Sequence, residues 1–424
     1  MVKRKIFMLL CCFFCLIGAP VFVAAPGQAQ TVTIRLFEIF LPQSLEIYAA
    51  ERNVPANSSA THLANTRRDQ SISKTENTEH LLISAANGPL FDAAPSRVRI
   101  VLTNFALQIQ SANGSRSLPL TDTVKISAND NYLFAAIPHP NDAKQKAKSE
   151  KKMAGNSSVA ARPYAGALQI YADGDELGVI NFAPVADYLA GVLAAELPQA
   201  ELPALQAQAV VSRTYMIKNW QRHLQDGYRF CDLTHCQTYK GMADITPTIR
   251  QAVTSTADEF LTFDDQPIAA YYSSTCGGTT ADDLGIWANA EDQPYLKSIA
   301  DGSFCSSSPH YRWRARILAD SLHQIWQRRL GEQITSISVT KEGADGRVRE
   351  LALLGNSLHL ISGEDFRAVT CRAFGWNTLK STWFNVQIEK RAYVFNGRGL
   401  GHGLGLCQYG AMEMARRGFS YREI

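Results

Sequence analysis

Hydrophobic and polar residues alternate in several short stretches of the first part of the chain. Apolar residues occupy every second position at Val32, Ile34 and Leu36 and again at Val98, Ile100 and Leu102. A period of two residues is typical of a strand that buries one face. We therefore expect a small β-rich N-terminal unit over residues 30–137, interrupted by a polar insert within residues 51–80.

The segment after this unit has a different composition. Residues 138–162 contain Pro-Asn-Asp, then a lysine-rich run, and then Gly-Asn-Ser-Ser. Residues of this kind do not form a buried face. We therefore expect a solvated linker between two parts of the chain.

From about residue 163 the pattern becomes a mixture of strands and helices. Alternating apolar residues on both sides of Asp173-Gly174-Asp175 predict a hairpin. Apolar residues four positions apart predict one helix from Pro184 to Glu196 and a second helix that begins at Pro203. Later apolar runs predict strands around residues 268–274, 337–339, 348–353, 358–361 and 386–388. Strands and helices do not alternate regularly, which favours an α+β fold.

The first 29 residues have the features of an export signal. A basic run at residues 3–5 precedes apolar residues 6–25, and small residues lead to Ala29. This order is typical of a secretory signal peptide that is cleaved. The apolar run is also about as long as the ~20 residues that span a bilayer, so a retained anchor is the alternative. We expect an exported protein, in the periplasm or at the cell wall.

The charge balance changes meaning once the export signal is recognised. The chain has 424 residues, with 42 basic and 39 acidic residues and a formal net charge of +3. The three basic residues at positions 3–5 account for this whole excess. The remainder is formally neutral, so no nucleic-acid partner is expected.

Five later segments carry a resemblance to a known family. They are residues 187–198, 205–215, 232–239, 271–280 and 397–411. Together and in this order they resemble the SpoIID/LytB family, which comprises stage II sporulation protein D and the amidase enhancer. The resemblance implies a SpoIID-like catalytic domain over residues 163–424, and it does not cover the first 160 residues.

Active members of this family are lytic transglycosylases. They cut the MurNAc–GlcNAc bond of peptidoglycan glycan strands, preferentially strands that an amidase has stripped of stem peptides. The resemblance implies that Glu196 is the single catalytic acid/base. One carboxyl group suffices, because the C6 hydroxyl of the substrate is the nucleophile and closes a 1,6-anhydro ring. The alternative for Glu196 is an ordinary polar residue at a helix end.

The resemblance implies further site residues. Arg213 would orient the acid or bind saccharide, with a surface salt bridge as the alternative. Substrate-binding side chains are expected at Gln237, Tyr239, Tyr272, Ser274, Thr275, His402 and Gln408. A tight turn after Thr275 and a structural role for His402 are the alternatives there. Gln206 stands where the family often has lysine, and Cys407 where it usually has a small polar residue.

Six of the nine cysteines lie outside the export segment. Cys231, His235 and Cys236 form a compact cluster, and His223 precedes them by eight residues. Some family members bind zinc in this segment, and thiolate and imidazole ligands suit tetrahedral Zn²⁺. We expect one structural zinc at these four residues, with a Cys231–Cys236 disulfide as the alternative, because export permits disulfides. Two further disulfides are open, Cys276–Cys305 and Cys371–Cys407.

These features together predict an exported lytic transglycosylase that acts on amidase-denuded glycan strands. The first alternative is a non-catalytic peptidoglycan-binding protein that enhances a cell-wall amidase. The second is a wall hydrolase with two carboxylates, in which Glu201 or Asp187 would serve beside Glu196. The expected partners are glycan strands and a cell-wall amidase.

Overall fold

The computed structural model describes residues 31–50, 80–91, 94–128, 132–137, 159–282 and 293–424. The expected export signal, most of the polar insert and most of the linker lie outside these residues. The chain divides into two compact units that interleave along the sequence. The sheet unit contains the described residues up to Gln199 together with Asn219–Asp258, and the helix unit contains Ala200–Lys218 and Glu259–Ile424.

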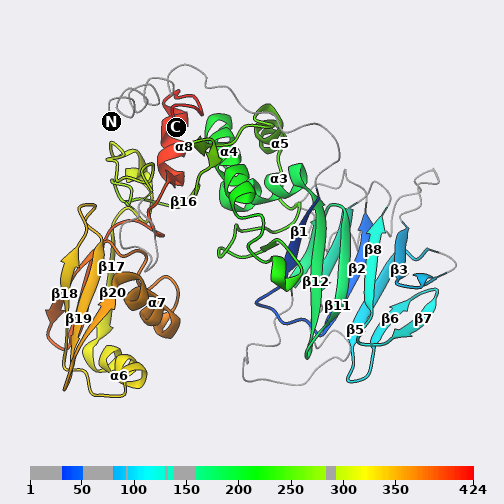
Figure 1. Cartoon of the computed structure of the whole chain (residues 1–424), viewed down its shortest axis with the longest axis horizontal. Helices are drawn as coiled ribbons and strands as arrows, with labels where there is room; N and C mark the ends of the chain where they lie inside the picture. The colour runs from blue at the N-terminus through cyan, green and yellow to red at the C-terminus, as the bar shows by residue number, and fades with distance from the viewer. Residues whose placement is uncertain (1–30, 51–79, 92–93, 129–131, 138–158, 283–292) are drawn as a thin grey trace, which may run out of the picture. The chain divides into compact units, whose positions relative to one another are not determined.

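Two β-sheets form most of the sheet unit (Figure 1). The larger sheet is antiparallel except where β1 meets β13. Its strand order is β13 (Phe230–Cys231), β1 (Thr31–Leu36), β12 (Glu176–Pro184), β11 (Ala167–Asp173), β8 (Thr123–Ala128), β3 (Leu81–Ala85) and β4 (Gly88–Pro89). The antiparallel smaller sheet has the order β10 (Val159–Tyr164), β9 (Tyr132–Ile137), β2 (Ser44–Ala50), β5 (Arg97–Leu102), β6 (Leu107–Ser111) and β7 (Gly114–Leu118).

The strands form where the sequence alternates. β1 buries Val32, Ile34 and Leu36, and β5 buries Val98 and Ile100. A strand with this pattern directs one face toward a core and the other toward solvent. Alternate burial of this kind therefore confirms the strands expected from the two-residue period.

The sheets join parts of the chain on both sides of the expected linker. β11 and β12 form the expected hairpin, with Asp173 opposite Glu176, and β12 pairs in turn with β1 near the start of the described chain. β10 begins at Val159, inside the segment expected to be a linker, and pairs with β9. The sequence before and after residues 138–158 thus contributes to both sheets.

Helix α3 (Val185–Glu196) follows β12 directly and confirms the first predicted helix. All seven residues from Tyr188 to Ala194 are buried, so this helix is covered on every side rather than on one stripe. Helix α5 (Pro247–Ser255) contacts α3 and begins at a side-chain cap, in which Thr246 accepts a hydrogen bond from the Ile249 N–H. A short 3-10 helix, η2 (Leu224–Asp226), precedes β13.

In its described residues, the helix unit combines small sheets with five helical segments. The helices are α4 (Leu202–Lys218), η3 (Phe304–Ser307), α6 (Ala319–Leu330), α7 (Gly363–Phe374) and α8 (Gln408–Arg416). One three-stranded sheet has the order β17 (Trp313–Leu318), β22 (Ala392–Gly397) and β21 (Phe384–Glu389), and the other has β18 (Ser336–Glu342), β19 (Val348–Leu354) and β20 (Leu358–Ser362). Two short pairs are β14 (Thr262–Phe263) with β15 (Gln266–Pro267), and β16 (Tyr272–Ser273) with β23 (Leu406–Cys407).

An aromatic core holds α6 and α7 on these strands. Trp326 of α6 stacks on Phe366 of α7 with ring centroids 5.6 Å apart, and Phe384 and Phe395 pack against them. The predicted strands at residues 337–339, 348–353, 358–361 and 386–388 are all present. The run at 268–274 forms a strand only at Tyr272–Ser273.

The observed mixture of separate sheets and helices confirms the α+β class. Helix α4 confirms the second predicted helix and contacts α8. Within the described part of the chain, no helix combines the length and the apolar character needed to cross a membrane.

Candidate functional site

Glu196 is the last residue of α3 and belongs to the sheet unit. Its side chain is partly buried. Its Oε1 accepts a 2.9 Å hydrogen bond from the backbone N–H of Thr238. The next residue, Leu197, still donates its N–H to the carbonyl of Leu193, so the helical geometry extends to the carboxyl-bearing residue. One oxygen of the predicted acid is therefore fixed by a backbone donor at the end of a rigid helix.

Gly191 lets α3 approach the segment that contains Thr238. A Cβ atom at Gly191 would lie 2.5 Å from the carbonyl oxygen of Gly241 and 2.6 Å from the ring of Tyr239. Non-bonded heavy atoms at optimal contact are about 3.5–4.0 Å apart, so no side chain fits there. The missing side chain thus permits the close packing that brings the Thr238 N–H to Glu196.

Gln237 and Tyr239 flank Thr238, and each is 1% exposed. The Gln237 amide donates to the Tyr188 hydroxyl, and the Tyr239 hydroxyl donates to Oδ1 of Asn181. These bonds point into the unit rather than toward solvent. The structure gives no support to the expected contact of these two side chains with substrate, because both are enclosed; they hold the backbone beside Glu196.

Arg213 and the other predicted substrate residues belong to the helix unit. Arg213 lies on α4 and is 7% exposed, and its Nη1 donates to the backbone carbonyl of Glu259 at 2.9 Å. The alternative of a surface salt bridge does not fit a guanidinium buried to this degree. On the same helix, Gln208 accepts a 3.5 Å hydrogen bond from the amide of Gln408, which is itself buried and begins α8.

The segment 271–280 presents some of its expected groups and buries others. Tyr272 and Ser274 are partly exposed, whereas Thr275 is 1% exposed. The Thr275 hydroxyl lies 2.7 Å from that of Ser308. The backbone of Thr275 also exchanges hydrogen bonds with Leu400, which joins this segment to residues 397–411. Thr275 therefore has a structural environment, while Tyr272 and Ser274 stay accessible.

His402 lies in the same part of the helix unit and is partly exposed. Its Nδ1 accepts a 3.0 Å hydrogen bond from the N–H of Leu404. Burial of the ring, together with the nearby Arg347 and Arg367, lowers the pKa of His402 to about 4. The imidazole is consequently neutral near pH 7, with Nδ1 as the acceptor.

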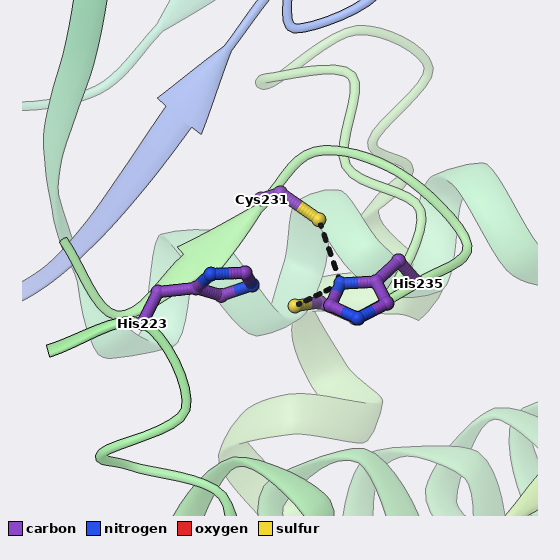
Figure 2. Close-up of side chains that lie close together, drawn as sticks. His223, Cys231 and His235 are labelled. Carbon is purple, nitrogen blue, oxygen red and sulfur yellow. Dashed lines mark hydrogen bonds between the residues drawn. The ribbon is translucent and has the colours of Figure 1, made fainter. Parts of the chain in front are cut away.

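The Cys–His cluster is brought together in the sheet unit. Nδ1 of His235 lies 3.7 Å from Sγ of Cys231 and 3.8 Å from Sγ of Cys236. One ligand atom from each of His223, Cys231, His235 and Cys236 lies within 4.8 Å of every other. Figure 2 shows the side chains of His223, Cys231 and His235 turned toward one another. The four residues expected from the sequence therefore form a group that could hold a metal ion.

The surroundings of this group fit a zinc ion. Nε2 of His223 is buried and has no hydrogen-bond partner among the described residues, while Nδ1 of the same ring lies 2.9 Å from a carboxylate oxygen of Asp226. A carboxylate on the outer nitrogen of a histidine is the common arrangement behind a zinc ligand. Two thiolates and two imidazoles complete a tetrahedral set. Sequence reasoning missed Asp226, although its position three residues after His223 was a usable signal.

The six cysteines among the described residues are all thiols in this structure. Cys371 lies in the aromatic core around Trp326, and its Sγ bonds to the backbone of Leu379. Cys407 lies instead beside Cys276 and Cys305. A Cys371–Cys407 disulfide, which the sequence left open beside a free thiol at Cys407, does not fit this structure, because the fold encloses the two thiols in different clusters.

Arg347 is a residue that no pattern in the sequence singled out. Its guanidinium is 1% exposed and donates to the carbonyls of Cys276 at 2.8 Å and Thr279 at 3.2 Å. A Cβ atom at Gly403 would lie 2.2 Å from its Nη2. Arg347 thus fills the space between the segments 271–280 and 397–411, although it belongs to neither.

Comparisons with known proteins identify relatives of large parts of the chain. Residues 173–263 match the family described as stage II sporulation protein, and residues 289–405 match a domain of unknown function, DUF8618. An uncharacterised protein of Brachyspira hyodysenteriae is 27% identical to this chain over 277 residues. The aligned region covers 62% of this chain and 69% of that protein. The amidase enhancer of Bacillus subtilis is 24% identical to this chain over 395 residues. That aligned region covers 78% of this chain and 55% of the relative.

A third relative is stage II sporulation protein D of Bacillus subtilis. It is 30% identical over 261 residues, which cover 57% of this chain and 71% of that protein. The matched family segment contains α3, α4 and the Cys–His cluster. These similarities confirm the resemblance seen in the sequence motifs, and this chain belongs to the stage II sporulation protein D family.

Proposed function

We propose that this protein is an exported lytic transglycosylase that cleaves MurNAc–GlcNAc bonds in peptidoglycan strands from which an amidase has removed the stem peptides. The observation that carries the proposal is the fixed carboxyl group of Glu196, at the end of α3 and bonded to the Thr238 N–H. Membership of the stage II sporulation protein D family supports it.

In the proposed reaction, one carboxyl group performs both proton transfers. Protonated Glu196 gives its proton to the glycosidic oxygen as the bond from that oxygen to C1 of MurNAc breaks. The C6 hydroxyl then forms the new bond to C1 and returns its proton to the Glu196 carboxylate. The products are a free hydroxyl on GlcNAc and a 1,6-anhydro-MurNAc end, and no water is consumed.

The helix unit by itself offers further groups that would bind a glycan strand without exchanging protons. Tyr272 and Ser274 are partly exposed and offer hydroxyls for the sugar. His402 is neutral near pH 7 and offers a hydrogen bond rather than a charge. We also propose that His223, Cys231, His235 and Cys236 hold a structural Zn²⁺, which would fix the loop that precedes Thr238.

The test uses the purified full-length protein and glycan strands treated with an amidase, in water enriched in ¹⁸O. Lytic transglycosylase activity predicts 1,6-anhydro-MurNAc ends without ¹⁸O, detected by mass spectrometry. Glu196→Gln should abolish these ends. Glu201→Gln and Asp187→Asn are matched controls that should keep them, since Glu201 is exposed and Asp187 pairs with Arg250.

Two outcomes separate the alternatives. Ends that carry ¹⁸O, and that disappear in Glu201→Gln or Asp187→Asn, would identify a two-carboxylate hydrolase instead. Intact strands that bind the protein and become better substrates for an added amidase would identify a non-catalytic enhancer. The similarity to a protein named amidase enhancer is the observation that favours this second candidate function.

A further inference from the structure

A second cluster of metal-binding side chains lies in the helix unit, apart from every residue used above for catalysis or zinc. It joins Cys276, Asp301, Cys305 and Cys407, whose ligand atoms all lie within 4.8 Å of one another. These residues come from three separate places: the turn after β16, the segment around η3, and the end of β23. Folding has therefore collected three thiols and one carboxylate from positions up to 131 residues apart.

Direct contacts connect the four side chains. The sulfurs of Cys276 and Cys305 are 3.6 Å apart, and Sγ of Cys276 lies 2.9 Å from Oδ2 of Asp301. The backbone N–H of Cys276 donates to Sγ of Cys407 at 3.2 Å. The other oxygen of Asp301 accepts a hydrogen bond from the Ser303 N–H, which orients the carboxylate.

The three sulfurs of the cluster are closed to solvent, and Asp301 is partly exposed. Cys276 and Cys305 are fully buried, Cys407 is 7% exposed, and Tyr311 and Tyr409 pack against the three sulfurs. The carboxylate of Asp301 lies against these buried sulfurs, where it would supply negative charge to a bound cation. Cys407 occupies the N-terminal cap position of α8, where the helix dipole favours negative charge on sulfur.

The geometry suits a tetrahedral metal better than a disulfide. Ligands about 2.3 Å from a zinc ion are about 3.8 Å from one another in a tetrahedron, and the observed sulfur separation is 3.6 Å. A Cys276–Cys305 disulfide would use the sulfur that lies 2.9 Å from Asp301 and would remove the S–H group that donates to this carboxylate. Three cysteines and one aspartate supply all four ligands of a closed structural site.

We propose that Cys276, Asp301, Cys305 and Cys407 form a second metal site, which binds a thiophilic divalent cation such as Zn²⁺. This site is separate from the Cys–His group of the sheet unit. The ion would cross-link the turn after β16, η3 and the start of α8. Ser274 lies two residues before Cys276 and is partly exposed, so the metal would stiffen the segment that presents this expected saccharide contact.

The test measures metal per chain in the full-length protein, purified without added reductant from cells grown with zinc. The Cys231→Ser/Cys236→Ser variant removes the sulfur ligands of the first group and should retain one zinc per chain. Adding Cys407→Ser to this variant should remove that remaining zinc. Cys371→Ser is the matched control, because Cys371 is a buried thiol of the same unit outside the cluster, and it should leave the metal content unchanged.

A further variant guards against simple misfolding. Asp301→Asn keeps all three sulfurs and should weaken zinc binding in a chelator competition while the circular dichroism spectrum stays that of the parent. Cobalt bound to the Cys231→Ser/Cys236→Ser variant should show thiolate-to-metal charge-transfer absorption, and Cys407→Ser should remove it. These readouts do not use glycan cleavage, so their failure is distinguishable from failure of the proposed enzyme activity.

Two results would overturn the second site. One is zinc content that Cys407→Ser leaves unchanged in the Cys231→Ser/Cys236→Ser variant. The other is a metal-free protein in which alkylation under denaturing conditions and peptide mapping reveal a Cys276–Cys305 disulfide, with Cys407 as a single free thiol.

Discussion

Gly191→Ala tests whether close packing of α3 positions Glu196. Alanine in place of glycine inside a helix ordinarily stabilises a protein by about 0.5–1 kcal/mol. Here the added methyl group would lie 2.5 Å from a backbone oxygen and 2.6 Å from the ring of Tyr239. Neither neighbour can yield easily, because one is backbone and the other is a buried ring held by a hydrogen bond to Asn181.

The magnitude follows from these opposing effects. Overpacking a well-filled core costs about 1–3 kcal/mol. The stabilisation that alanine ordinarily gives inside a helix offsets part of this cost. We therefore expect the free energy of unfolding of the sheet unit to fall by roughly 1–2 kcal/mol. For a unit of this size, that corresponds to a decrease of roughly 2–8 °C in Tm.

The assay combines thermal unfolding with local hydrogen exchange measured by mass spectrometry. Peptides that cover α3 and residues 237–241 should exchange faster in Gly191→Ala, and cleavage of denuded glycan should slow because the Thr238 N–H no longer meets Glu196 correctly. Ala186→Gly in the exposed first turn of α3 is the control, since it changes helix propensity without a close contact. A Gly191→Ala protein that is more stable than wild type, with unchanged exchange, would refute the packing argument.

Three further outcomes are expected. Asp226→Asn should lower zinc affinity at the Cys–His group by about 10–100-fold in a chelator competition, because it removes the partner that orients His223; unchanged affinity would contradict that role. Because the folded-state pKa of His402 is about 4, below its usual value of 6.5, its contribution to stability is complete above about pH 6.5 and is lost as pH falls toward 4. His402→Gln should therefore show a smaller decrease in Tm between pH 7 and 5 than wild type, and an equal decrease would count against the assignment. Arg347→Met should lower the free energy of unfolding in urea by about 1–3 kcal/mol, because it leaves the carbonyls of Cys276 and Thr279 without their buried donor while Asp345 keeps its pair with Arg349; an unchanged free energy of unfolding would show that these contacts are not needed.

Local patterns in the sequence were sufficient to predict several elements. The four-residue period predicted α3 and α4, and the two-residue period predicted β1, β5 and the β11–β12 hairpin. The Cys–His group was also predictable, because Cys231, His235 and Cys236 are so close in sequence that one loop can bring them together. In each case, the residues that form the sequence pattern are close in sequence to the residues that form the structure.

Only the tertiary structure decided which distant segments meet. An alternation with a period of two residues indicates that a strand buries one face, but it does not indicate which strand will be its neighbour. The pairing of β1 with β12 and β13 could therefore not be predicted. The burial of Gln237 and Tyr239 depends on α3 and on Asn181, and these contacts leave no local trace in the sequence. The expected substrate role of both side chains lost its support for this reason.

The sequence by itself determined the class of the fold, the helix that ends at Glu196 and the family motifs. The tertiary structure decided the environment of that carboxyl group, through the absence of a side chain at Gly191 and the backbone donor of Thr238. It also gathered Cys276, Cys305 and Cys407 around Asp301. The physical reason is the same in both cases: periodicity and spacing record local burial, whereas contacts between distant residues arise only when the chain packs into its core.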